Sequence, residues 1–249
     1  MNFKEKTNLL KLPFVYLKNK LFPQKTYAQH NEDIVIQEVI GEIKRFIDIG
    51  TNDGMACSNT FLFAIKGANG LCFEPVSQTF YRLSWLYLLN GKIKCIKEGI
   101  SNIHKEIIIK DEDLLSYIPD TQDPWGQENL SKYMSNKNKF EKINVKPLNY
   151  WLEYYPEFQK SDFVSLDIEG HELCALQGID FSIFQTKCFI IETMGRSHHN
   201  YEAIVQLLNE NNYQPLLMNK LNTFWFFKGL VSKEKLKEVS NKFSDYTVL

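Results

Sequence analysis

Acidic residues follow two apolar segments of this 249-residue chain, at positions where they could take part in catalysis. Asp167, Glu169 and His171 come after one apolar segment, and Glu192 ends the next. Carboxylates held close together raise one another's pKa, which brings one of them into the range of a general base at neutral pH. A base of that kind can take a proton from an attacking hydroxyl group. The sequence predicts Asp167 or Glu169 as the base, with His171 as the alternative.

A glycine-containing turn follows an earlier apolar segment, in the stretch Phe46-Ile-Asp-Ile-Gly-Thr-Asn-Asp-Gly54. Glycine there permits positive φ angles and lets the backbone approach a ligand closely. The chain has neither the G-x-G-x-x-G fingerprint nor a phosphate loop, which disfavours pyrophosphate binding. Glu74 closes the next apolar segment, where a carboxylate could accept hydrogen bonds from both hydroxyls of a ribose. Together these residues indicate a nucleoside site.

Short apolar runs alternate with amphipathic ones along the middle of the chain, which is the βα pattern of a doubly wound sheet. We expect a mainly parallel seven-stranded sheet with an antiparallel strand at the C-terminal end, formed by a hairpin. Helices are expected over about 58–66, 77–89 and 200–209, after Pro147 and from Glu172. The strands are expected at 45–49, 70–73, 92–97, 162–168, 188–192, 214–218 and 223–227, with shorter ones at 107–109 and 143–145.

Composition excludes several classes of protein. With 44% hydrophobic and 24% charged residues, the chain predicts a globular domain. The 29 basic residues against 30 acidic ones give a net charge of -1, so nucleic acid is not expected as a partner. No apolar run reaches the roughly 18 residues of a spanning helix, and no secretory signal is present. The five scattered cysteines indicate reduced core thiols, and the expected location is the cytoplasm.

Two segments fall outside the βα pattern. Residues 1–25 carry six lysines against one acid, interleaved with leucine and phenylalanine, as in a segment that lies on an anionic membrane at the inner face. The alternative is a helix, interrupted by Pro13, that packs on the domain or on a partner subunit. Residues 26–249 are expected to form one domain with a polar insert at about 111–142. Aromatic residues of the insert, including Trp125, could stack on a sugar or form a small core of their own.

A strand, a D-x-G-x-x-x-G turn and an acid that ends the next strand resemble the class I S-adenosylmethionine-dependent methyltransferases. Further segments resemble the FkbM family within that group, in its order and spacing. They run from Tyr27 to about Phe227, and Asn31 replaces the family's usual glycine. The insert and the first 25 residues depart from the family, so the acceptor is not carried over. The matching segments are Tyr27–Asp33, Ser58–Thr60, Phe73–Pro75, Asp167–Glu172 and Ile190–Glu192.

The resemblance implies a role for each matching residue. The methionine part of S-adenosylmethionine would be held by Asp48, Gly50, Asn52 and Gly54, and its ribose by Glu74 beside Pro75. Gln29 and Asp33 would line the same end, Asp167 would also contact the cofactor, and Ile100 with Ser101 would contact the adenine. Ser58 or Asn59 could add hydrogen bonds, although a simple helix cap explains Ser58 equally well. Acceptor contacts are expected from Trp125, Glu192, His198 and His199.

The predicted function is an S-adenosylmethionine-dependent O-methyltransferase. Its acceptor would be a small molecule or a glycan, with a sugar hydroxyl of a glycan, glycolipid or secondary metabolite as the expected site. A divalent cation on Asp167, Glu169 and Glu192 is not expected to be required. Two alternatives stay open, namely a nicotinamide-dependent oxidoreductase on a similar fold and a cofactor-binding protein without catalytic activity. The oligomeric state is not predicted.

Overall fold

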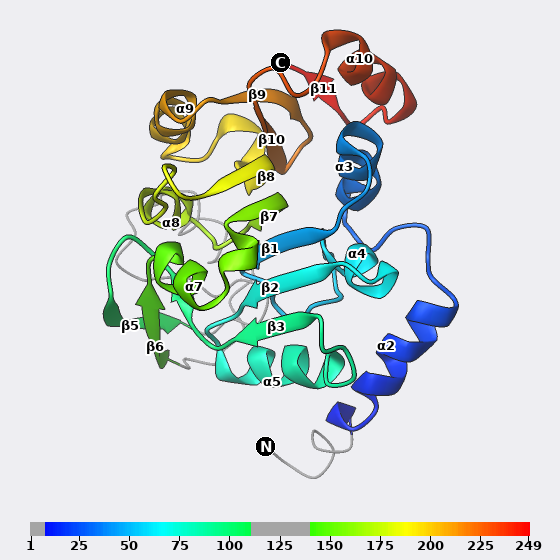
Figure 1. Cartoon of the computed structure of the whole chain (residues 1–249), viewed down its shortest axis with the longest axis vertical. Helices are drawn as coiled ribbons and strands as arrows, with labels where there is room; N and C mark the ends of the chain where they lie inside the picture. The colour runs from blue at the N-terminus through cyan, green and yellow to red at the C-terminus, as the bar shows by residue number, and fades with distance from the viewer. Residues whose placement is uncertain (1–7, 111–139) are drawn as a thin grey trace.

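The computed structural model describes residues 8–110 and 140–249, and Trp125 with most of the insert lies outside this part. One sheet runs through the molecule with helices on both sides (Figure 1). Its strand order is β11-β9-β10-β8-β7-β1-β2-β3. The strands are β1 (Arg45–Ile49), β2 (Asn69–Phe73), β3 (Ile93–Ile96), β7 (Lys160–Leu166), β8 (Gln185–Glu192), β9 (Tyr213–Met218), β10 (Asn222–Phe227) and β11 (Thr247–Val248).

The sheet has the predicted mixture of directions. Neighbouring strands are parallel from β3 through β2, β1 and β7 to β8. β10 then runs antiparallel to β8, and β9 pairs with β10 as the expected hairpin. The prediction of seven strands omitted one, because the two-residue strand β11 pairs antiparallel with β9 at the edge. A pair of residues at the chain end is too short to show an alternating pattern.

Helices cover both faces of the sheet, as a doubly wound fold requires. α2 (Leu12–Leu21), α3 (Glu32–Ile40), α4 (Phe61–Lys66), α5 (Ser77–Leu86) and α10 (Lys233–Lys242) contribute side chains to the apolar core on one face. On the other face the core is formed with α7 (Leu148–Tyr154), α8 (Glu172–Gln177) and α9 (Tyr201–Glu210). Phe46 and Ile47 illustrate the arrangement, since these successive residues of β1 are fully buried in opposite cores.

A second, three-stranded sheet lies apart from the main one and has the order β4-β6-β5. The segments predicted at 107–109 and 143–145 belong to it, as parts of β5 (Lys105–Lys110) and β6 (Phe140–Lys146), which pair antiparallel. The unpredicted β4 (Gly99–Ile100) pairs in parallel with β6. Ile109, Ile143 and Val145 pack with Val76 as a small apolar cluster. The sheet therefore carries its own core.

Several predicted boundaries were wrong. The helix expected from Ser58 begins at Phe61, because Ser58 instead accepts hydrogen bonds from the backbone N–H groups of Thr60 and Phe61. A turn at Leu10 and Lys11 separates the helical residues Asn8 and Leu9 from α2, and Pro13 lies in the first turn of α2, where a missing N–H costs nothing. The five cysteines are free, but Cys57 is exposed and is not a core thiol. Among residues 8–110 and 140–249, no helix is long and apolar enough to cross a membrane.

Candidate active site

The strand register aligns four residues at one edge of the main sheet. Ile49 lies opposite Phe73 of β2 and opposite Leu166 of β7, and Leu166 lies opposite Ile191 of β8. The residue that follows each of these positions therefore falls in one row. That row is Glu74, Gly50, Asp167 and Glu192. Three carboxylates from distant parts of the chain thus meet at the carboxyl ends of parallel strands, where such sheets bind their ligands.

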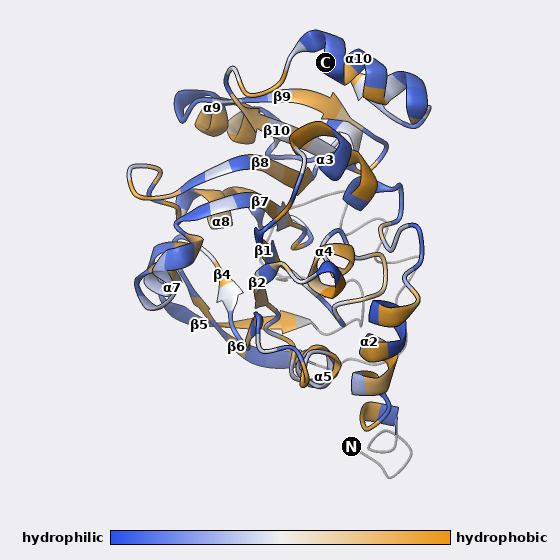
Figure 2. Cartoon of the chain, turned by 45° about the vertical axis from the view of Figure 1, so that its right-hand side comes forward, coloured by the Kyte–Doolittle hydropathy of each residue, from blue (hydrophilic) through white to orange (hydrophobic). Residues whose placement is uncertain are grey.

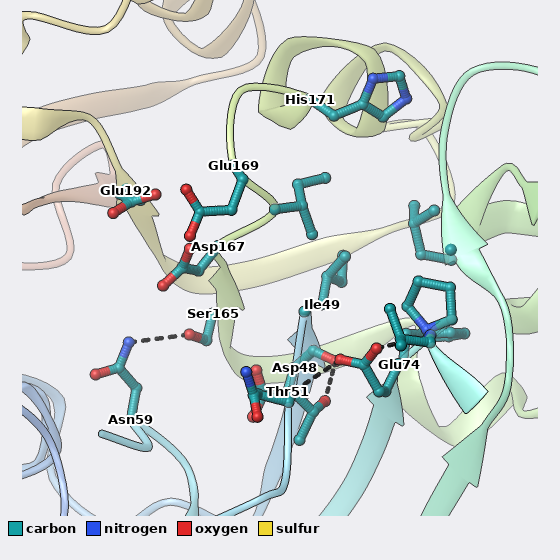
Figure 3. A pocket seen from close by; sticks show the side chains of 18 of the residues that line it. Asp48, Ile49, Thr51, Asn59, Glu74, Ser165, Asp167, Glu169, His171 and Glu192 are labelled. Carbon is teal, nitrogen blue, oxygen red and sulfur yellow. Dashed lines mark hydrogen bonds between the residues drawn. The ribbon is translucent and has the colours of Figure 1, made fainter. Parts of the chain in front are cut away.

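A pocket of about 600 Å³ opens along this row. Its size suits a ligand of drug-like dimensions. Figure 3 shows Glu74 toward one side of the pocket and Asp167, Glu169 and Glu192 toward the other, with Ile49 between them. The lining includes the following residues predicted from the sequence: Gln29, Asp48, Gly50, Asn52, Ser58, Asn59, Glu74, Pro75, Ile100, Asp167, Glu169, His171 and Glu192.

The turn after β1 is fixed by a buried carboxylate. Asp48 is 5% exposed, and its Oδ2 accepts a hydrogen bond of 2.5 Å from the hydroxyl of Thr60. The pKa of Asp48 is raised to about 7, mainly by burial and in smaller part by the charge of Asp167, while the Thr60 hydrogen bond acts in the opposite direction. Thr51 donates to the backbone carbonyl of Asp48 at 2.9 Å, which closes the turn. Asp48 therefore ties the turn after β1 to the segment that precedes α4.

Glu74 is buried and holds the same turn from the other side. One of its oxygens accepts from the backbone N–H of Asn52 at 3.0 Å, and the other from that of Val76 at 2.8 Å. Asn52 has a φ of 55°, a conformation that asparagine tolerates better than most residues. Both oxygens of Glu74 thus act as hydrogen-bond acceptors at the border of the pocket.

The second sheet supplies an apolar side of the pocket. Ile109 of β5 and Ile143 and Val145 of β6 line it, and Ile100 of β4 adjoins them. Glu74 and Pro75 lie next to Val76, which packs into the same cluster. A ligand with one flat apolar part and one polar part would find both environments here.

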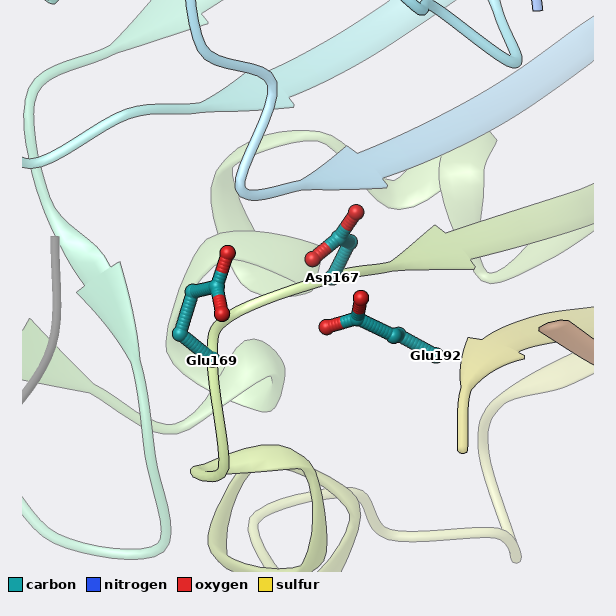
Figure 4. A group of neighbouring side chains, drawn as sticks. All are labelled: Asp167, Glu169 and Glu192. Carbon is teal, nitrogen blue, oxygen red and sulfur yellow. The ribbon is translucent and has the colours of Figure 1, made fainter. Parts of the chain in front are cut away.

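Three carboxylates converge at the other side of the pocket. One oxygen each from Asp167, Glu169 and Glu192 lies within 4.8 Å of the other two (Figure 4). Asp167 and Glu192 share a hydrogen bond. Removal from bulk water raises the pKa of Asp167 to about 6, although its side chain is open to the pocket itself. Burial, together with the charges of Asp167 and Glu169, raises the pKa of Glu192 well above its usual value.

The loop that presents Glu169 is held by another buried carboxylate. Glu169 has a φ of 53°, which is costly for a residue with a side chain. The fully buried Glu172 accepts from the N–H groups of Ile168 at 2.9 Å and Gly170 at 3.3 Å, on either side of Glu169. Its other oxygen lies 2.8 Å from Nε2 of His198. Glu172 thus fixes the backbone on both sides of the strained residue.

A match to a family of known proteins bears on this arrangement. The sequence model described as the methyltransferase FkbM domain matches residues 48–215, about two thirds of the chain, from Asp48 through the carboxylate cluster to the hairpin. This chain belongs to the FkbM methyltransferase family. No curated protein matches it.

Solved structures of methyltransferases resemble the fold at low identity. One is a methyltransferase FkbM from Methylobacillus flagellatus, with a TM-score of 0.47 and 17% identity over 74% of this chain and 44% of that one. This FkbM family member therefore spans less than half the length of that protein. Another is an O-methyltransferase from Bacillus cereus in complex with SAH, with a TM-score of 0.48 and 9% identity over 89% and 91% of the two chains.

Two residues expected to contact the cofactor do not line the pocket of this FkbM family member. Asp33 is buried at the start of α3, where it accepts hydrogen bonds from Thr26, from the N–H of Tyr27 and from its neighbour Ile34. Gly54 has a φ of 83°, and a β-carbon there would lie 2.6 Å from the side chain of Leu83 in α5. Both residues instead shape loops that carry lining residues. Asp33 holds the loop of Gln29, and Gly54 belongs to the loop of Asn52.

Three further residues also lie outside the lining. Ser101 is buried, and its hydroxyl lies 3.0 Å from Nε2 of His171, whose own ring turns away from the carboxylates (Figure 3). His198 is bound to Glu172 behind the loop. His199 is exposed and pairs with Asn200. Trp125 lies outside the described residues.

Sequence reasoning missed several lining residues. Ser165 is the second-last residue of β7, and its hydroxyl accepts from the side-chain amide of Asn59 at 3.1 Å. A serine in the apolar end of a buried strand could have indicated it. Met194 and Leu221 line the pocket from the segments after β8 and before β10. Their apolar character gives no sign of this position.

Proposed function

We propose that this protein binds S-adenosylmethionine in the pocket at the strand ends and transfers its methyl group to a hydroxyl of an acceptor. One observation carries the proposal: a hydrogen-bond-accepting carboxylate, Glu74, and the carboxylate cluster lie at two sides of a single pocket in a chain of the FkbM methyltransferase family. The first suits a ribose diol, and the second suits a hydroxyl that must lose its proton.

The residues present fit this cofactor. Gly50 lines the pocket with its backbone, because the space that a side chain would take is filled by the carbonyl group of Asp167. Glu74 lines the pocket as a carboxylate that would accept from the ribose, and the isoleucines of the second sheet would cover an adenine ring. Gln29 and Asn52 would contact the methionine part from the surrounding loops. When bound, S-adenosylmethionine supplies a methyl group that is already activated on a sulfonium.

The chain's own part in the reaction is to orient the acceptor and take its proton. Asp167 is the proposed base, since its raised pKa makes it more basic than an ordinary aspartate while still ionised at neutral pH. Glu192, whose pKa is raised by burial and by the charges of Asp167 and Glu169, would hold Asp167 in place through the hydrogen bond between them. Glu169 would accept a hydrogen bond from a neighbouring hydroxyl of the acceptor.

A sugar is the proposed acceptor class. The acceptor side of the pocket presents Asp167, Glu169 and Glu192, which accept hydrogen bonds, and the amide of Asn59 beside Ser165. A polyhydroxylated ring offers several hydroxyl donors to such a set. We propose that no divalent cation is required, because Asp167 and Glu192 are held together by a hydrogen bond with each other.

The test is methyl transfer from labelled S-adenosylmethionine to a panel of sugars, sugar nucleotides, glycolipids and amines, with and without a chelator. The wild type should label sugar hydroxyls in both conditions. Asp167→Asn should reduce turnover by at least 100-fold, whereas the exposed Glu157→Gln should have no effect. Labelling of amines alone, loss of activity with chelator, or full activity of Asp167→Asn would each contradict a stated part of the proposal.

A further inference from the structure

Helix α2 has one buried face and one exposed apolar face. Tyr16 is 1% exposed, and its hydroxyl donates to the backbone carbonyl of Ala64 in α4 at 3.2 Å while accepting from the side chain of Asn90 at 2.7 Å. Pro13 is also buried. The helix is therefore anchored to α4 and to the segment after α5, so its opposite face has a fixed position on the molecule.

The exposed face carries a row of large apolar side chains. Phe14 is 70% exposed, Leu17 38% and Leu21 72%, and Leu10, in the turn before the helix, is 56% exposed. Phe14, Leu17 and Leu21 are separated by three and four residues, so at 3.6 residues per turn they lie on one side of the helix. Phe22 follows at 75% exposure. Scattered exposed apolar residues are ordinary, but an aligned row of this kind marks an interaction surface.

Lysines flank this row on both sides. By the same helical spacing, Lys11 and Lys18 fall on one side of the row and Lys20 on the other. Residues 8–25 contain four lysines and no acidic residue. In the described part of the chain, these lysines form no ion pair. Figure 2 shows the resulting alternation of hydrophobic and hydrophilic segments along α2.

We propose that α2 is a membrane-docking helix, which inserts its apolar row among the lipids of an anionic bilayer while the flanking lysines contact the headgroups. An apolar row between two basic borders is the arrangement of helices that lie in a membrane interface. The positive charge selects an anionic lipid surface over a neutral apolar partner. This role goes beyond methyl transfer and does not depend on it.

The side of α2 that faces the molecule contacts loops next to the pocket. Asn19, between the buried and exposed faces, contacts the sulfur of Met55 and accepts from the hydroxyl of Tyr27 at 2.8 Å. Met55 is next to Ala56, and Tyr27 is two residues before Gln29. Ala56 and Gln29 both line the pocket. The docking helix thus touches two segments that border the pocket.

The experiment is co-sedimentation of the full chain with neutral phosphatidylcholine vesicles and with vesicles that contain phosphatidylglycerol. The wild type should bind the anionic vesicles at least tenfold more tightly. Phe14→Ser/Leu21→Ser should weaken this binding at least tenfold, and Lys11→Gln/Lys18→Gln/Lys20→Gln by about 100-fold, at roughly fivefold for each lysine. The replaced side chains are exposed, so the melting temperature should not change. The matched control, Lys233→Gln/Lys237→Gln on α10, should bind as the wild type does.

Two results would overturn the proposal. One is equal binding of the wild type and both α2 variants to anionic vesicles. The other is a wild-type dimer in analytical ultracentrifugation that Phe14→Ser/Leu21→Ser converts to a monomer without any vesicle binding, since a second copy of the chain would then occupy the face.

Discussion

Gly50 and Asp167 are in direct backbone contact: a β-carbon at position 50 would lie 1.8 Å from the carbonyl oxygen of Asp167. The contact joins the turn after β1 to the residue that begins the carboxylate cluster. Gly50 also has a φ of 85°, a conformation that side chains disfavour. Glycine at this position therefore sets the distance between the proposed cofactor loop and the proposed base.

Replacing Gly50 should separate these two segments. Gly50→Ala should lower the free energy of unfolding by about 2 to 4 kcal/mol, from backbone strain plus the clash. Urea denaturation measures this. Gly41→Ala is the matched control, because Gly41 has a φ of 81° but nothing within 4 Å of its β-carbon position. Its free energy of unfolding should fall only by the contribution of backbone strain. Equal losses in the two variants would show that the contact with Asp167 has no effect.

Glu172 should act as a positioning residue for Glu169. His198 accepts a hydrogen bond from the N–H of Asn200 at Nδ1, so its Nε2 carries the proton that Glu172 accepts. Glu172→Gln would turn an N–H donor toward that proton or toward the loop amides. We expect turnover to fall at least tenfold, with S-adenosylhomocysteine affinity within threefold of the wild type.

The control for Glu172→Gln is Glu153→Gln, at an exposed position of α7. It should leave turnover and affinity unchanged. If Glu172→Gln lost cofactor affinity and turnover in parallel, Glu172 would support the whole fold instead of this loop.

The proposed base predicts how the rate depends on pH. Asp167 must be ionised to accept a proton, and its pKa is raised to about 6. The logarithm of kcat/KM should therefore rise by about one for each pH unit below 6 and level off above it. Steady-state kinetics from pH 4.5 to 8 measure this. A profile that is already flat at pH 5 would show an unperturbed carboxylate or a different base.

Asp48 predicts how stability depends on pH. Its folded-state pKa of about 7 lies above the unfolded value, so the folded state binds the proton more tightly. Protonated Asp48 makes its full contribution to the free energy of unfolding below about pH 4. This contribution, up to about 4 kcal/mol, is lost as the pH rises to 7. Urea unfolding of the wild type and of Asp48→Asn at pH 5 and pH 8 measures the pH-dependent contribution of Asp48. Identical pH dependence in the two proteins would contradict it.

The sequence predicted the strands of the main sheet well because parallel strands buried on both faces are nearly continuous apolar runs. It also located Glu74, Asp167 and Glu192, since each carboxylate directly follows such a run. A strand end is both a visible change of composition and the place where a parallel sheet binds ligands. The sequence and the physical reason for the site therefore coincide at these residues.

Two residues predicted from family motifs support loops and do not line the pocket. Asp33 and Gly54 match the family's motifs, yet one accepts hydrogen bonds from its own loop and the other packs against α5. A motif marks residues that must be present and does not say which way they point. The second sheet was missed as a separate unit because its strands pair across the long insert, which no local pattern reveals.

Isothermal titration with S-adenosylmethionine and S-adenosylhomocysteine measures cofactor binding without any acceptor. We expect one saturable site for each ligand in the wild type. We also expect an affinity at least tenfold lower in Glu74→Gln, which loses one of the two acceptor oxygens proposed for the ribose. If folded wild-type protein bound neither ligand, or if Glu74→Gln bound both as tightly as the wild type, the pocket would not be the proposed S-adenosylmethionine site.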